Sequence, residues 1–169
     1  MTDRASQIVK IQQGFTLIEL IIVIVVVGIL AVTAGPRIFG KAGTDEAVVE
    51  GQVLSLLRLQ QQRALQDPIN RCYGVAITGA HITPVNCGEV IAADRIVSLP
   101  SHVTVSVTTT LPNGGTGFYF NGLGCPVSTG HATNAETCGQ SSVQLRFQGV
   151  SERQICVQSQ GYIRTGSCP

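Results

Sequence analysis

The chain has 169 residues, a formal net charge of +1 and only 12% charged residues. A near-neutral charge argues against a general affinity for nucleic acid or anionic lipid, because both attract an excess of Lys and Arg. Beyond the apolar N-terminal run described next, about 120–130 residues remain, enough for one globular domain with a single core.

The apolar run extends from Phe15 to Gly35, and no residue from Leu20 onward in it is charged. Its 21 residues would form a helix of roughly 31 Å, which matches the bilayer core of about 30 Å. The alternative, a helix buried in a soluble core, is rarely apolar on all sides over this length. The sequence therefore predicts a membrane-spanning helix over residues 15–36.

Residues 1–14 are polar, and Arg4 and Lys10 could hold this segment in the cytoplasm. A secretory signal places its small-residue cleavage site after the apolar region. Here the small residue, Gly14, comes before it. We therefore expect residues 1–14 to be a leader that is removed while the apolar helix stays in the mature protein.

The junction reads Gly14-Phe15-Thr16-Leu17-Ile18-Glu19, and Gly28 and Pro36 follow downstream. This pattern resembles the cleavage and methylation motif of type IV prepilins and type II secretion pseudopilins. The resemblance implies that a prepilin peptidase cuts after Gly14 and that the new amino group of Phe15 is methylated. It also implies an α+β pilin fold, in which a long N-terminal helix packs on an antiparallel β-sheet head.

Glu19 is the acidic residue within the apolar run. A carboxylate at full membrane depth costs up to about 2.5–3.5 kcal/mol, so Glu19 should either have a partner or reach the headgroups. Cleavage would create an ammonium group on Phe15, about one helical turn away. In the pilin family this Glu is thought to engage the N-terminal amine of its own or a neighbouring subunit. The resemblance thus implies that Glu19 is an assembly residue.

A second helical segment is expected over residues 37–67. Pro36 should kink or loosen the helix before it, and Thr44-Asp45-Glu46 could restart the helix with acids at its positive end. Asp67-Pro68 should end it.

This second segment is apolar over an unusually wide arc. One face should pack on a sheet of the same subunit, and the others on neighbouring subunits; the alternative is burial within its own domain. The first face holds Val49, Val53, Leu57 and Ala64, the second Ala47, Leu54 and Leu65, and the third Val48 and Leu59.

Beyond Pro68 the apolar pattern changes to the alternation of β-strands, and the chain therefore belongs to the α+β class. No second domain or internal repeat is evident. The expected strands are Tyr73–Thr78, Val90–Leu99, Val103–Thr109, Phe118–Asn121, Val143–Phe147, Arg153–Gln158 and Tyr162–Arg164, with loops at Leu111–Gly117 and Leu123–Gln140.

Six cysteines lie beyond the apolar run: Cys72, Cys87, Cys125, Cys138, Cys156 and Cys168. An even number in this part of the chain indicates disulfides formed in an oxidising compartment. No metal site is expected, because there is no CxxC pair and the histidines lack ligand spacing. Six cysteines allow 15 pairings. We favour pairing between sequence neighbours: 72–87, 125–138 and 156–168.

No enzyme motif is present, so we expect neither catalysis nor a cofactor. Gly114–Gly117 lacks the following helix and Lys of a phosphate-binding loop, and no Ser lies in a nucleophile elbow. His81, His102 and His131 have no neighbouring carboxylate pattern. Nucleic-acid binding is also not expected, because Arg146, Arg153 and Arg164 are isolated charges that would give a weak, salt-sensitive site.

The helix ending RLQQQRALQD and the final RQICVQSQGYIRTGSC resemble minor pilins of the FimT, GspH and MSHA-type group. This resemblance implies a structural subunit of a type IV pilus that serves adhesion, motility or uptake. Its implied partners are other pilin subunits, the prepilin peptidase, the inner-membrane assembly platform and the membrane. The subunit would cross the bacterial inner membrane once, with its head in the periplasm, before entering the pilus. A type II secretion pseudopilin and a membrane-anchored ligand- or DNA-binding module remain as alternatives.

Overall fold

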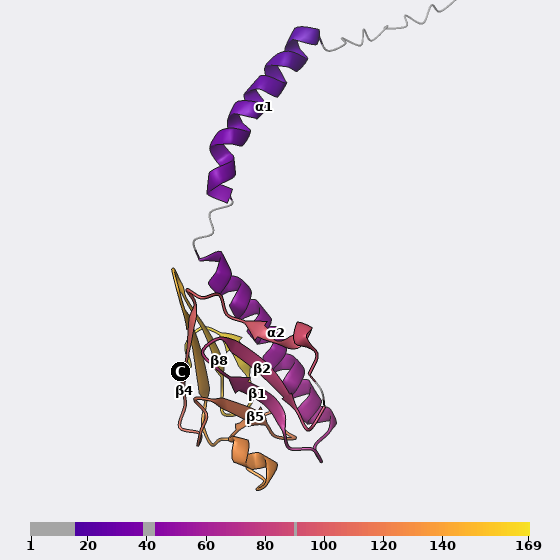
Figure 1. Cartoon of the computed structure of the whole chain (residues 1–169), viewed down its shortest axis with the longest axis vertical. Helices are drawn as coiled ribbons and strands as arrows, with labels where there is room; N and C mark the ends of the chain where they lie inside the picture. The colour runs from indigo at the N-terminus through magenta and orange to yellow at the C-terminus, as the bar shows by residue number, and fades with distance from the viewer. Residues whose placement is uncertain (1–15, 39–42, 90) are drawn as a thin grey trace, which may run out of the picture. The chain divides into compact units, whose positions relative to one another are not determined.

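The computed structural model describes residues 16–38, 43–89 and 91–169, with side chains for all of these except 31–38. The chain divides into two units, Met1–Gly40 and Lys41–Pro169. Each unit is considered by itself (Figure 1).

The first unit contains one helix, α1 (Leu17–Ile38). Its residues are almost all good helix formers or β-branched residues without polar groups, so nothing within the helix competes for its backbone hydrogen bonds. The helix continues through Pro36 to Ile38, and Pro36 therefore lies in its last turn. The expected kink at Pro36 stays a prediction.

The second unit begins with the helix α2 (Thr44–Gln66). Gly43 precedes it with φ +82°, a left-handed conformation that suits glycine and does not continue a helix. Asp45 and Glu46 lie in the first turn, where the positive end of the helix dipole favours acids, as expected. The helix expected over 37–67 therefore starts only at Thr44.

Within the described residues, the remainder of the second unit forms two antiparallel sheets. The five-stranded sheet has the order β3-β2-β1-β5-β6 and the four-stranded sheet the order β4-β7-β8-β9. The first comprises β1 (Tyr73–Ile77), β2 (His81–Asn86), β3 (Val97–Ser98), β5 (Gly117–Phe120) and β6 (Pro126–Val127); the second comprises β4 (Thr104–Thr108), β7 (Val143–Gln148), β8 (Glu152–Val157) and β9 (Ile163–Thr165).

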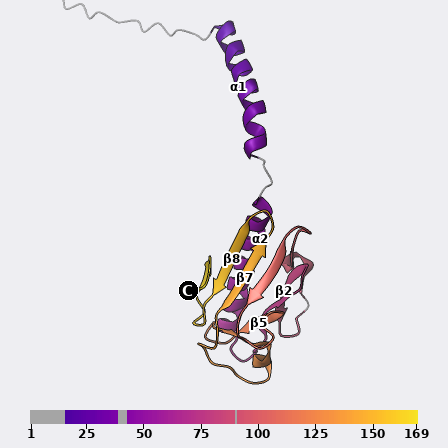
Figure 2. The same cartoon turned by 90° about the vertical axis from the view of Figure 1, so that its left-hand side faces the viewer.

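Helix α2 contacts strands of both sheets, and Figure 2 shows it behind the strands. Its predicted inward face is confirmed, because Val49, Val53, Leu57 and Ala64 are all buried. The core continues through Phe118 of one sheet and, in the other, through a layer in which Leu145 pairs with both Val107 and Ile155.

Six of the seven expected strands are confirmed, with ends shifted by at most one residue. The expected strand Val90–Leu99 is wrong: its described part holds a short 3-10 helix, η1 (Ala93–Arg95), and only two strand residues, β3. The Val and Ile residues of this segment do not make it one strand, because Ala92–Arg95 are all exposed and bury no strand face.

Two strands were not predicted. Strand β2 contains Pro84, which lies opposite Val75 of β1. Within the described residues, strand β3 pairs with His81 and Ile82 of β2 and does not reach Pro84. The edge of β2 that faces away from β1 is therefore open at Pro84, and the missing N–H of the proline costs no hydrogen bond between strands there. Strand β6 lies in the expected loop Leu123–Gln140, which also contains the short helix η2 (Thr129–Ala132).

The six cysteines form the three pairs favoured from the sequence: Cys72–Cys87, Cys125–Cys138 and Cys156–Cys168. The first joins the open end of the β1–β2 hairpin, next to the register pair Tyr73↔Asn86. The second closes the loop that carries η2, and the third ties the last residues of the chain to β8. Each bond thus restrains a hairpin, loop or terminus that has little core of its own.

Candidate assembly site

The expected processing junction, Gly14 and Phe15, lies outside the described residues. The described residues begin at Thr16, one residue before α1. Cleavage after Gly14 and methylation of Phe15 therefore stay predictions.

Glu19 occupies the first turn of α1 and is exposed. Its backbone N–H donates to the Oγ1 of Thr16 at 3.3 Å and to the Thr16 carbonyl at 3.1 Å. Thr16 is therefore the N-cap of the helix, and Thr-x-x-Glu is the spacing of a capping box. The sequence interpretation missed this second role of the motif, although the spacing itself could have revealed it.

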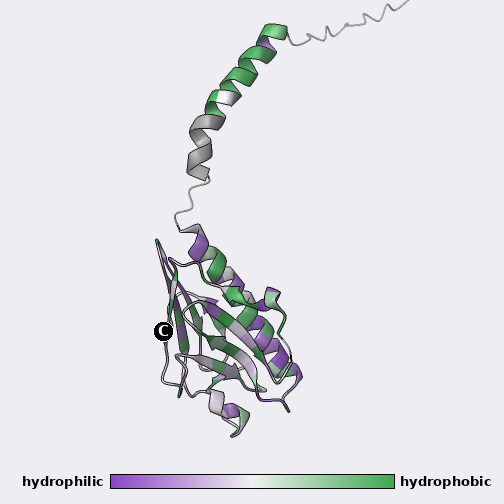
Figure 3. Ribbon diagram, viewed as in Figure 1, coloured by the Kyte–Doolittle hydropathy of each residue, from purple (hydrophilic) through white to green (hydrophobic). Residues whose placement is uncertain are grey.

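The large apolar side chains of α1 that the structure describes are all exposed within the chain. From Leu17 to Leu30 they expose between 42 and 76% of their surface. Figure 3 shows the coloured part of this helix as mostly hydrophobic, and Glu19 is its acidic residue. Such a helix needs cover from outside its own unit, because apolar surface of this extent is unfavourable in water.

Among the residues whose placement is described, no helix combines the length and the hydropathy needed to cross a membrane.

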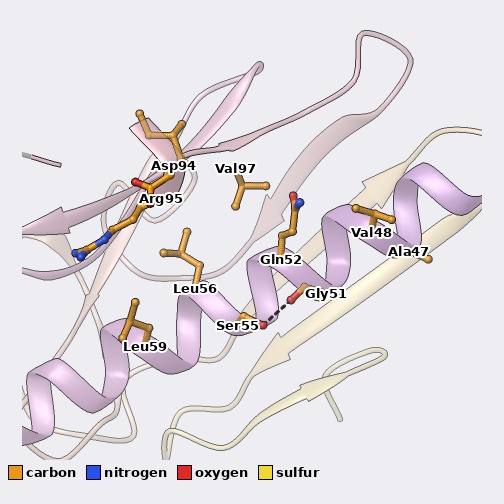
Figure 4. A pocket seen from close by; sticks show the side chains of 11 residues that line it. Ala47, Val48, Gly51, Gln52, Ser55, Leu56, Leu59, Asp94, Arg95 and Val97 are labelled. Atoms are coloured by element: carbon orange, nitrogen blue, oxygen red, sulfur yellow. Dashed lines mark hydrogen bonds between the residues drawn. The ribbon is translucent and has the colours of Figure 1, made fainter. Parts of the chain in front are cut away.

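The outward face of α2 is the second apolar surface. Val48, Leu59 and Leu65 are exposed there, as expected for the faces assigned to neighbouring subunits. The first two border a groove of about 570 Å³ between α2 and the segment Asp94–Val97 (Figure 4).

Small residues, Ala47, Gly51 and Ser55, contribute to the helical side of this groove. Apart from its chain neighbours and the nearby backbone of the helix, no atom lies within 4 Å of the position that a Cβ on Gly51 would take. The Ser55 hydroxyl donates to the Gly51 carbonyl at 2.9 Å, so it is satisfied within the helix (Figure 4). At the other side of the groove, Asp94 and Arg95 are both exposed, as expected of a solvated pair. The surface is therefore mainly apolar with a charged rim.

Two of the three histidines contact acidic residues, which the sequence pattern did not indicate. His102 Nε2 lies 3.2 Å from Asp45 of α2. His131 is buried in η2, and its Nδ1 accepts the N–H of Glu136 at 2.8 Å. The first contact joins residues far apart in the chain, and the second depends on the turn after η2. Neither contact could be predicted from the spacing of these residues in the sequence.

These polar contacts do not form a nucleophilic site. The Ser128 hydroxyl bonds to the Glu136 carboxylate and not to the imidazole of His131. In a serine hydrolase triad the imidazole must contact the hydroxyl to take its proton. No group of three His, Cys, Asp or Glu side chains in the described part of the chain is arranged to hold a metal ion.

The three arginines considered for nucleic acid lie on the four-stranded sheet but are not equivalent. Arg146 lies 3.4 Å from Glu152, and Arg164 donates to the Ser167 carbonyl. Arg153 lies opposite Phe147 on the neighbouring strand and is exposed. Two of the three are thus engaged by groups of the same sheet or its C-terminal extension.

The comparisons with known proteins agree with the motif. Residues 9–35 match the family model described as the prokaryotic N-terminal methylation motif. No curated protein sequence matches the chain.

Two crystal structures of the type IV minor pilin FimU from Pseudomonas aeruginosa align with 72% of this chain, at a TM-score of 0.49. Their sequences are 10 and 11% identical to it, and 87 and 92% of their lengths are covered. A similarity of this size supports no conclusion here. The family model is different, because it includes Gly14, Phe15 and Glu19, the residues from which the resemblance to prepilins was drawn. The chain therefore carries the prokaryotic N-terminal methylation motif at its N-terminus, joined to a disulfide-bonded α+β domain.

Proposed function

We propose that the chain is a structural subunit, a minor pilin, of a type IV pilus. The observation that carries the proposal is the methylation motif over residues 9–35, with Gly14-Phe15 at its cleavage position and Glu19 at the start of α1. In this proposal a prepilin peptidase removes residues 1–14 and methylates Phe15. The mature N-terminus then remains cationic at neutral pH.

The proposed mechanism is assembly through α1. The exposed side chains between Leu17 and Leu30 must be covered, by lipid before assembly and by like helices afterwards. The uncharged run from Leu20 to Gly35 supports storage of the precursor in the inner membrane as a single-pass protein with its head in the periplasm. Packing in a bundle then replaces contacts with lipid by contacts with protein.

Glu19 supplies the specific contact in this scheme. The Glu19 side chain is exposed, and its carboxylate makes no hydrogen bond or ion pair within the described part of the chain. The methylated amine of Phe15, of the same or a neighbouring subunit, is the proposed partner. Pairing these charges removes the cost of an isolated carboxylate in an apolar bundle.

The second unit would form the head of the subunit. Its three disulfides suit an oxidising compartment such as the periplasm or the cell exterior. The exposed apolar residues Val48, Leu59 and Leu65 give α2 a surface for neighbouring subunits. Adhesion, motility and uptake are the processes that such a filament would serve, and the assembly platform in the inner membrane is its proposed site of incorporation.

The experiment is mass spectrometry of the N-terminus of the chain recovered from sheared surface filaments. We expect a chain that begins at a methylated Phe15. The variant Gly14→Leu should keep residues 1–14 and be absent from the filaments, because a bulky side chain blocks the junction. Gln13→Leu, one residue earlier, is the matched control and should be processed normally.

An intact segment 1–14 on chains that are recovered from filaments would contradict the proposal. A deletion of the whole chain, scored for both surface pili and secreted enzymes, separates a pilus from a secretion system. Loss of secreted enzymes with normal pili would replace the pilus assignment by that of a pseudopilin.

A further inference from the structure

The loop between β6 and β7 closes on itself through Cys125–Cys138 and contains the short helix η2. In Figures 1 and 2 it forms the end of the second unit that lies opposite the start of α2. The loop is held by a set of polar contacts that no step of the proposed assembly uses.

His131 is the central residue of these contacts, and only 4% of it is exposed. Its Nδ1 accepts a hydrogen bond from the backbone N–H of Glu136 at 2.8 Å. An imidazole nitrogen accepts only when it carries no proton, so the neutral ring is protonated on Nε2. Addition of a second proton must place it on Nδ1, where it would face the N–H of Glu136.

Glu136 connects this contact to the rest of the loop. Its carboxylate accepts the backbone N–H of Ser128 at 2.8 Å and also the Ser128 hydroxyl. Its carbonyl accepts from Asn121 Nδ2 at 3.3 Å. Residue 136 is therefore bonded both to the start of the loop, at Ser128, and to Asn121, which precedes Cys125.

Asn121 in turn orders the turn that precedes β6. Its Oδ1 accepts the N–H groups of Leu123 and Cys125, each at 3.0 Å. The same segments line a surface hollow of about 380 Å³, and Leu123 exposes 75% of its side chain beside it. A change at His131 can thus be transmitted through Glu136 and Asn121 to an exposed apolar residue.

We propose that His131 is an acid-sensitive latch: protonation of its Nδ1 breaks the hydrogen bond from Glu136 and releases the loop closed by Cys125–Cys138. The disulfide keeps the two ends of the loop joined, so the release is a local rearrangement and not an unfolding of the head. The surface around Leu123 then differs between neutral and mildly acidic surroundings.

Two charged groups act on the His131 ring, Glu136 from its own loop and Arg71 from the segment before β1. Burial lowers the pKa of His131; the carboxylate of Glu136 opposes this shift and Arg71 adds to it. A lowered pKa means that the neutral ring stabilises the fold above the ordinary value of about 6.5. That stabilisation is lost as the pH falls through the lower folded-state pKa.

The test is hydrogen exchange at the amide of Glu136, measured on the full-length chain in a mild detergent. The range runs from about pH 7.5 to about pH 4.5, because burial lowers the pKa of His131 below the ordinary value of about 6.5. The variant below keeps every carboxylate and therefore accounts for their titration in this range. After correction for intrinsic exchange, the protection of this amide should fall about fivefold in acid, the order expected when one neutral hydrogen bond is lost.

The variant His131→Asn places an amide oxygen near the position of Nδ1 and cannot titrate. Its protection at Glu136 should change little between the two pH values. His81→Asn is the matched control, because His81 is exposed and its hydrogen bonds with Thr78 are made by its backbone and not by its ring. This control should show the wild-type fall. A fall in the wild type that is no larger than in His131→Asn overturns the proposal.

Discussion

At the scale of single residues, Glu46 is the charged side chain on which the position of α2 most depends. It is fully buried, and its Oε1 accepts the backbone N–H groups of Val150 and Ser151 in the β7–β8 turn. Its Oε2 is buried without a hydrogen-bond partner in the described part of the chain. A Cβ on Gly149 would collide with this carboxylate, so the turn needs glycine there.

The hydrogen bond to its own backbone N–H, together with those from Ser151 and Val150 and the charge of His102, lowers the pKa of Glu46, although burial opposes the shift. A lowered pKa stabilises the fold above the ordinary value of about 4.5, and this stabilisation is lost as the pH falls through the lower folded value. The variant Glu46→Gln should therefore lower Tm at neutral pH, and its deficit should shrink in acid. Thermal unfolding at a series of pH values measures this.

The control for this prediction is Glu50→Gln, which makes the same charge change one turn later on α2. Glu50 is half-buried, and its carboxylate makes no hydrogen bond or ion pair in the described part of the chain. Its deficit should be small at every pH. Equal deficits for the two variants would show that the contacts of Glu46 with the β7–β8 turn are not the cause.

Gln61 is the second residue that joins distant segments. Its Nε2 donates to the carbonyls of Gly124 at 2.8 Å and Gly161 at 2.5 Å, and both glycines are buried with positive φ. The variant Gln61→Leu leaves both carbonyls without this donor and should lower the free energy of unfolding by about 1–3 kcal/mol. Denaturant unfolding measures the loss.

Gln62→Leu is the matched control, because Gln62 is exposed and its side chain makes no hydrogen bond within the described residues. It should stay within about 0.5 kcal/mol of the wild type. A loss in Gln61→Leu no greater than in this control would mean that the two loops are held by other contacts.

At the scale of elements, the burial pattern of α2 separates its structural face from its outward face. The double variant Val48→Thr/Leu59→Gln makes the outward face polar with little change of shape. Because both side chains are exposed, the free energy of unfolding should change by about 0.5 kcal/mol or less. Under the proposed function, the amount of chain in sheared filaments should fall severalfold.

The control Ile69→Ser removes an exposed apolar side chain outside the groove. It should leave the recovery in filaments unchanged. An equal loss in both variants would indicate a general effect of surface polarity and not a role of this face of α2.

The elements differ in how far the sequence predicts them, and the difference has a physical cause. Val143, Leu145 and Phe147 are all buried on β7, so alternation alone located that strand. Strand β2 was missed because it contains Pro84. A strand can hold this proline only where its backbone faces an open edge of the sheet. Such a position depends on pairing between strands, which no local pattern contains.

The polar contacts of the sites were predictable only where they are local. The Thr16–Glu19 spacing of the capped first turn could be read from the sequence. The contacts of Glu46 with Val150 and Ser151 join residues more than a hundred positions apart, and nothing in their spacing indicates them. Pairing of the cysteines between sequence neighbours was favoured from the sequence, and the structure contains the same three pairs.

At the scale of the whole molecule, Glu19 has two possible contributions, and assembly separates them. In the proposed assembly its carboxylate pairs with the methylated amine of Phe15. The alternative is that the carboxylate serves the first turn of α1 through the capping-box spacing, where the Thr16 hydroxyl accepts the Glu19 backbone N–H. A capping box accepts Gln in place of Glu, because the side-chain amide oxygen can accept the same backbone N–H. Pairing with a cation needs the full negative charge.

The variant Glu19→Gln therefore keeps the cap and removes the charge. We expect it to insert into the inner membrane and to be cleaved like the wild type, yet to be at least about tenfold depleted from sheared filaments, a factor that corresponds to about 1.4 kcal/mol of lost pairing. Glu19→Ala, which loses both contributions, should be depleted to a similar extent. Normal recovery of Glu19→Gln together with loss of Glu19→Ala would assign Glu19 to the helix cap, and filament entry would then depend on the apolar surface of α1 alone.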